Sequence, residues 1–123
     1  MPTQSKEKII RALFAAYLSN DRKAVEDYFI DGFRFTSPYD DAIDKAAYFE
    51  RCWRVSDWIE RHELERIFVQ GEEAVVTYKC AARSGRSFRN TEFFVFDGDK
   101  IKHIDVYFGA TYQDGAFVRQ SET

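Results

Sequence analysis

Apolar side chains in the first part of the chain recur three or four positions apart, which is the spacing of amphipathic helices. This spacing predicts a long helix that carries the apolar positions from Ile9 to Leu18, a shorter one after Asn20-Asp21, which can cap it, and a third from about Asp44. The apolar positions that carry these predictions are Ile9, Ile10, Leu13, Phe14, Tyr17 and Leu18, then Val25, Tyr28 and Phe29, then Ala46, Phe49, Cys52 and Trp53.

The second part of the chain has the alternating pattern of strands. A short strand over residues 33–37 ends at Pro38, and four longer strands are predicted over residues 58–70, 73–83, 86–96 and 100–111. Turn-forming residues separate these four, so consecutive strands run antiparallel as a meander. Helices followed by strands indicate an α+β domain with its helices packed on one face of a curved sheet.

The last two strands carry apolar side chains on one face and mixed side chains on the other. The face expected toward the helices has two polar residues, Asn90 and Glu92, in apolar surroundings. The members of this inner face are Phe88, Asn90, Glu92, Phe94 and Phe96 with Ile104, Val106 and Phe108, and those of the outer face are Arg89, Thr91, Phe93 and Val95 with His103, Asp105 and Tyr107.

Composition narrows the class of protein. The 123 residues suit one domain spanning residues 1–123. Aromatic residues make up 17% of the chain, and this excess suggests an aromatic-lined cavity or interface. The net charge of -3, with both signs interspersed, argues against a nucleic-acid or membrane-binding surface.

Cys52 and Cys80 are too few for a disulfide framework, and neither has a metal-binding spacing. We therefore expect no metal and no cofactor. The N-terminal residues lack the apolar stretch of a signal peptide, and no apolar run reaches the length of a membrane span. By elimination, we expect a cytoplasmic protein.

Several segments together resemble the SnoaL-like polyketide cyclases and ketosteroid isomerases of the nuclear transport factor 2-like superfamily. They are FAAYLSND at 14–21, FIDGFRF at 29–35 followed by Ser37-Pro38, EFFVFDGDKI at 92–101 and VYFG at 106–109. The resemblance, over roughly residues 8–109, implies a cone-shaped fold with three N-terminal helices on a curved, mostly antiparallel sheet. It does not fix the function, because this superfamily includes isomerases, cyclases, dehydratases, epoxide hydrolases and non-enzymatic binders.

The resemblance also indicates where acid and base groups lie in relatives. Ketosteroid isomerases use an Asp base and an oxyanion hole made by a Tyr and a protonated Asp. The Tyr position falls at Leu13, the base at Ser37 and the protonated Asp at Glu92, so only the last keeps a carboxyl group. The working Asp of SnoaL-like cyclases and limonene-type epoxide hydrolases falls at Val106, and the neighbouring Asp105 points to the other face.

Glu92 is the candidate catalytic residue. A carboxyl group among phenylalanine side chains is desolvated, which raises its pKa and makes it a neutral donor or a base. The alternative is a structural carboxylate paired with Arg54, Arg83 or a backbone group.

Other residues are expected to bind or enclose a ligand. Tyr17 offers a hydroxyl donor, and its alternative is a core side chain with a hydrated hydroxyl. Asn90 is placed to orient Glu92 or a ligand carbonyl, and its alternative is a hydrogen bond to a neighbouring strand end. The remaining candidate walls of the cavity are Tyr39, Trp53, Trp58, Tyr78, Phe88, Val106 and Phe108. Asp40 or Asp41 either supplies a displaced base or caps the third helix, and His62 has no evident partner.

Three functions remain open. The first is a cofactor-free acid–base enzyme acting on a small cyclic or polyketide-like compound, and the second is a non-catalytic domain that binds a small apolar molecule. The third is a scaffold with a filled core. The outer sheet face, with Thr91, Phe93, Val95 and Tyr107, is apolar enough to predict a homodimer, which is common in the superfamily that the chain resembles.

Overall fold

The computed structural model describes residues 5–119, except for the side chain of Val55, and confirms the α+β class. Three helices, α1 (Lys6–Leu18), α2 (Arg22–Tyr28) and α3 (Lys45–Cys52), pack against a seven-stranded sheet. The strands are β1 (Phe29–Ser37), β2 (Asp40–Asp44), β3 (Ile59–Gln70), β4 (Glu73–Ala82), β5 (Ser87–Asp97), β6 (Lys100–Gln113) and β7 (Ala116–Val118). The four long strands lie within two residues of their predicted bounds, whereas β2 and β7 were not predicted.

Each helix begins at a side-chain cap. Ser5 accepts a hydrogen bond from the Lys8 amide, and Asp21 accepts one from the Ala24 amide, as the sequence predicts for α2. The cap of α3 is Asp44, which accepts from the Ala47 amide at 2.9 Å. The expectation that Asp40 or Asp41 caps this helix is therefore wrong, because β2 occupies residues 40–44 and delays the start of the helix.

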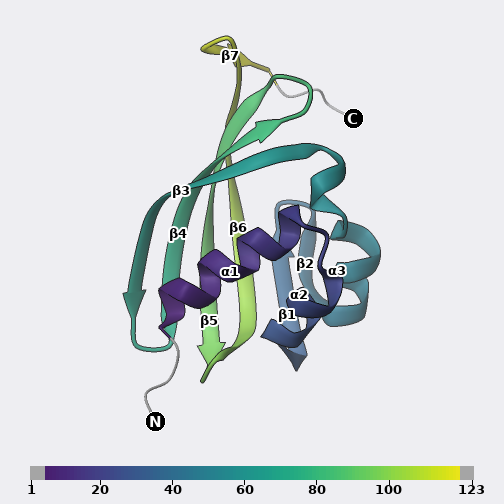
Figure 1. The fold of residues 1–123 in the computed structure, drawn as a ribbon, viewed down its shortest axis with the longest axis vertical. Helices are drawn as coiled ribbons and strands as arrows, with labels where there is room; N and C mark the ends of the chain where they lie inside the picture. The colour runs from purple at the N-terminus through teal and green to yellow at the C-terminus, as the bar shows by residue number, and fades with distance from the viewer. Residues whose placement is uncertain (1–4, 120–123) are drawn as a thin grey trace.

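The sheet has the strand order β2-β1-β6-β5-β4-β3 and curves around α1 (Figure 1). All pairs are antiparallel except β1 with β6. The pairing of β5 with β6 shifts between Phe88 and Asn90, opposite Gly109. A side chain at Gly109 would meet the backbone carbonyl oxygen of Arg89. Glycine therefore permits the bulge at this point of β5 and β6.

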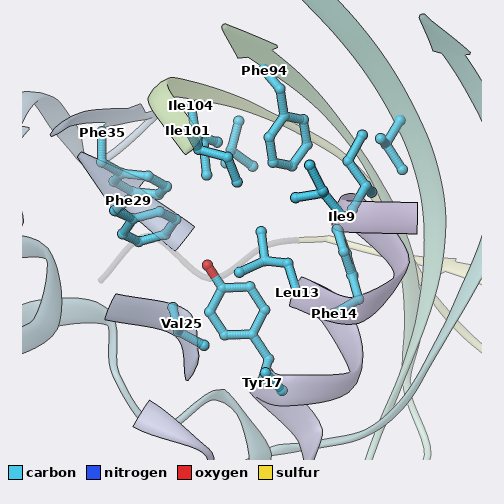
Figure 2. Close-up of a cluster of buried hydrophobic side chains, with 14 of the residues drawn as sticks. Ile9, Leu13, Phe14, Tyr17, Val25, Phe29, Phe35, Phe94, Ile101 and Ile104 are labelled. Carbon is cyan, nitrogen blue, oxygen red and sulfur yellow. The ribbon is translucent and has the colours of Figure 1, made fainter. Parts of the chain in front are cut away.

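The core fills the space between α1 and the concave face of the sheet. Phe94 of β5 projects toward Ile9 of α1, and Tyr17 projects toward Phe29 of β1 (Figure 2). Ile104 and Val106 are buried and Tyr107 is 62% exposed, as the alternation in this strand predicts. Within residues 5–119, none of the helices has both the length and the apolar character that crossing a bilayer requires.

Candidate functional site

A cavity of about 690 Å³ lies between α1, α3 and the sheet. Its wall is formed by α1, α3, the turn before β3, the β1–β2 connection and the inner face of β3 to β6. All ten candidate residues from the sequence lie in this wall: Tyr17, Tyr39, Trp53, Trp58, Tyr78, Phe88, Asn90, Glu92, Val106 and Phe108. The structure thus brings them together, and their roles in binding or catalysis stay predictions.

Sheet register explains how the polar residues meet. Directly paired residues on neighbouring strands point to the same face, so each pair forms one rung of the concave surface. Three successive rungs line the cavity: Cys80 with Phe88, Tyr78 with Asn90, and Glu92 with Val106. Tyr78 of β4 therefore lies beside Asn90 and diagonally opposite Glu92 of β5.

These three side chains form one hydrogen-bonded chain. The Tyr78 hydroxyl donates to Glu92 Oε2, and Asn90 Nδ2 donates to the Tyr78 hydroxyl at 3.3 Å. The alternative in which Arg54 or Arg83 pairs with Glu92 is wrong. Arg54 pairs with Asp57, and Arg83 donates to the Ser56 carbonyl oxygen. No arginine among the described contacts neutralises Glu92.

Burial governs the charge of Glu92. Desolvation raises the pKa of this carboxyl to about 7, although the hydrogen bond from Tyr78 opposes the rise. The direction is the one that the sequence predicts. Since part of the side chain remains accessible through the cavity, the protonated and ionised forms can both meet a bound molecule near neutral pH.

Two buried tyrosines form a second polar pair in the wall. The hydroxyls of Tyr17 on α1 and Tyr48 on α3 lie 2.5 Å apart. Burial raises the pKa of both well above the usual value, so both stay protonated. Tyr17 is thus engaged by a partner that the sequence interpretation missed. Helical spacing could have predicted this partner. Tyr48 lies four positions before Cys52, so the two side chains share one face of α3, and Cys52 also lines the cavity.

His62 also lines the cavity, although no role was expected for it. The Phe14 and Tyr78 rings pack nearly perpendicular to the imidazole, with ring centroids 5.1 and 5.5 Å away. Desolvation lowers the pKa of His62 to about 4, so the imidazole is neutral at physiological pH. A neutral imidazole offers one donor and one acceptor.

Asp40, at the start of β2, also lies in the cavity wall. Arg51 Nη2 lies 2.8 Å from Asp40 Oδ1, and the Ser37 hydroxyl donates to Asp40 Oδ2 at 3.3 Å. The thiols of the cavity remain protonated, because burial raises the pKa of Cys52 to about 11 and of Cys80 to about 12. Neither cysteine has the thiolate character of a nucleophile.

Aromatic pairs frame the cavity near its solvent side. The rings of Trp58 and Phe88 stack with centroids 5.8 Å apart, and those of Tyr39 and Phe108 lie 5.5 Å apart. Trp58, Tyr39 and Phe108 are all substantially exposed. These rings therefore surround the opening and leave the cavity unfilled.

Comparison with known families agrees with this architecture. The model of the SnoaL-like domain family matches residues 10–104, which is most of the chain. The chain belongs to this family. A comparison with curated proteins found no match.

Several solved structures similar to this SnoaL-like domain are described as nuclear transport factor 2-like proteins. A protein of unknown function from Cytophaga hutchinsonii has 15% identity and a TM-score of 0.71, covering 88% of this chain and 94% of its own. A provisionally named isomerase from Rhodopseudomonas palustris has 20% identity and a TM-score of 0.69, covering 88% and 91%. A provisionally named polyketide cyclase from Sinorhizobium meliloti has 20% identity and a TM-score of 0.65, covering 80% and 93%. At these identities the similarity shows the fold alone.

The positions at which the resemblance places acid and base groups lie in different environments in this SnoaL-like domain. Leu13 lies fully buried in the core, and Val106 adds an apolar wall to the cavity. Asp105 pairs with His103 at 2.7 Å on the outer sheet face, so it does not reach the cavity. Glu92 is the carboxyl group that remains on the inner face of β5 and β6.

Proposed function

We propose that this SnoaL-like domain binds a small, largely apolar cyclic compound and transfers a proton to or from it without a cofactor. Glu92 is the proposed acid–base group. The observation that carries the proposal is a carboxyl group with a pKa of about 7 opening into a cavity with aromatic walls. A group that titrates near the working pH is present both as acid and as base, which suits general acid–base catalysis.

The other residues divide into orienting groups and walls. Tyr78 holds one oxygen of Glu92, which leaves the other free for a ligand. Trp53, Trp58, Phe88 and Phe108 supply the apolar surface that a ring would contact. Isomerisation, cyclisation and dehydration all require proton transfer, and two structural neighbours carry the provisional names isomerase and polyketide cyclase.

Hydrogen–deuterium exchange of 2-tetralone in D₂O tests the proposal. This bicyclic ketone has acidic protons next to its carbonyl group, and NMR follows their replacement by deuterium. We expect the protein to accelerate this exchange above the rate in buffer. Binding of 2-tetralone and of a panel of cyclic ketones without conversion would instead favour the non-catalytic binder, and absence of binding would favour the scaffold.

We further propose that two copies pair through the outer sheet face. Tyr107 is 62% exposed there, beside the partly exposed Phe93 and Val95. Covering this apolar surface favours a symmetric dimer. Sedimentation at micromolar concentration is expected to give twice the 14.5 kDa mass of the chain, and Tyr107→Asp is expected to give the monomer. Tyr39→Asp, away from this face, is the control that keeps the dimer, and a monomeric wild type would contradict the proposal.

A further inference from the structure

Buried polar atoms without partners gather in the cavity wall. Among the described side chains, three buried atoms lack a hydrogen-bond partner: Asp40 Oδ1, His62 Nδ1 and Asn90 Oδ1. All three residues line the cavity. Arg51 forms an ion pair with Asp40 Oδ1, although this contact does not have the geometry of a hydrogen bond. Since Asp40 has this ion pair, His62 Nδ1 and Asn90 Oδ1 are the two atoms that point to groups satisfied by a bound molecule, because buried polar groups are normally paired.

The orientation of Asn90 follows from its neighbours. A tyrosine hydroxyl has one proton, and Tyr78 donates it to Glu92. The Tyr78 oxygen can therefore only accept a hydrogen bond from Asn90, so the Nδ2 end of the Asn90 amide faces the Tyr78 hydroxyl. The Oδ1 end remains free, and Asn90 is only 8% exposed. The free group on this rung is thus an acceptor.

His62 lies on the neighbouring rung, since it pairs with Cys80 while Asn90 pairs with Tyr78. The residues that carry these two unpartnered atoms are linked through Tyr78, which packs against the imidazole and accepts a hydrogen bond from the Asn90 amide. A ligand carbonyl cannot satisfy Asn90 Oδ1, because both are acceptors. A ligand carboxylate would meet a neutral imidazole and the nearby Glu92, while the two arginines that line the cavity, Arg51 and Arg54, are already paired with Asp40 and Asp57.

We propose that the ligand is a hydroxylated ring compound whose hydroxyl group binds between His62 and Asn90. A hydroxyl donates one hydrogen bond to Asn90 Oδ1 and accepts from, or donates to, the imidazole. The proposal rests on the proposed small-molecule site and names its ligand class, but it does not require proton transfer by Glu92. Removing either His62 or Asn90 costs the hydroxyl one of its two partners.

Paired ligands test this proposal. 2-Naphthol and 2-methylnaphthalene have nearly the same size, and only the first has a hydroxyl group. The ratio of their dissociation constants is measured in the wild type, Asn90→Leu and His62→Phe, with Glu65→Gln as a control outside the cavity. We expect each polar-to-apolar variant to reduce the preference for 2-naphthol roughly tenfold, and the control to leave it unchanged. An unchanged ratio in both polar-to-apolar variants would overturn the proposal.

A measurement on the wild type avoids dependence on the folding of these variants. The imidazole nitrogens of ¹⁵N-labelled His62 are expected to shift on addition of 2-naphthol and to stay in place with 2-methylnaphthalene. The same shift with both compounds, or no binding of 2-naphthol at millimolar concentration, would contradict the hydroxyl site. Loss of catalysis in Glu92→Gln concerns the proposed function and leaves this preference unaffected, so the two proposals fail separately.

Discussion

Glu92→Gln is expected to reduce the exchange of 2-tetralone protons roughly 100- to 10,000-fold, the usual contribution of a general acid–base group. Glutamine has nearly the same shape and can still accept the hydrogen bond from Tyr78. It cannot take up or release a proton at neutral pH. Binding of 2-tetralone, measured by ligand-detected NMR, is therefore expected to change only a few-fold.

The matched control is Glu65→Gln, which makes the same change outside the cavity. Glu65 pairs with Arg89 at 2.8 Å and does not line the cavity, so its variant is expected to keep the wild-type exchange rate. Full exchange activity in Glu92→Gln would place the proton transfer on another group. Loss of binding with an unchanged rate for the bound ketone would make Glu92 an anchor.

Phe94→Ala is expected to lower the free energy of unfolding by about 3–5 kcal/mol, the range for removing a buried phenylalanine ring. Phe94 is completely buried in β5, between the Ala74 and Ile104 positions of the neighbouring strands, and it packs near Ile9 of α1 (Figure 2). Removing the Phe94 ring leaves a void between the sheet and α1. Urea denaturation followed by circular dichroism measures the change.

Phe117→Ala provides the comparison for this core variant. Phe117 is 67% exposed in β7, so we expect its removal to change stability by less than about 0.5 kcal/mol. Equal effects of the two substitutions would mean that Phe94 does not occupy the core position assigned to it here.

The sequence predicts those parts of the fold that local periodicity determines. Alternation along β5 and β6 places Glu92 and Asn90 on the inner face with Phe94, and Asp105 on the outer face. Helical spacing places Tyr17 on the buried side of α1. In these elements each side chain's direction follows from its own strand or helix, so no distant contact is needed.

Residues whose positions depend on pairing with distant segments were missed. The inward direction of His62 is hard to derive because β3 contains register shifts between Ile59 and Arg61 and between Leu64 and Arg66, which interrupt strict alternation. The partner of Tyr17 is 31 residues away, so its hydrogen bond depends on how α1 and α3 pack.

The two unpredicted strands have different causes. β2 is rich in Asp, which disfavours strands, and it forms because β1 offers a free edge. The short strand β7 follows Asp114-Gly115, both with positive φ, and this dipeptide is a recognised hairpin signal that the sequence interpretation did not use.

The most direct test of the acid–base claim is the titration of Glu92 by ¹³C NMR of its side-chain carboxyl group, assigned by comparison with Glu92→Gln. We predict a midpoint near pH 7, because the desolvation of the charged form outweighs the hydrogen bond from Tyr78. A midpoint at or below about 4.3, the ordinary value for glutamate, would show a stabilised carboxylate and contradict the proposed role of Glu92 as the acid–base group.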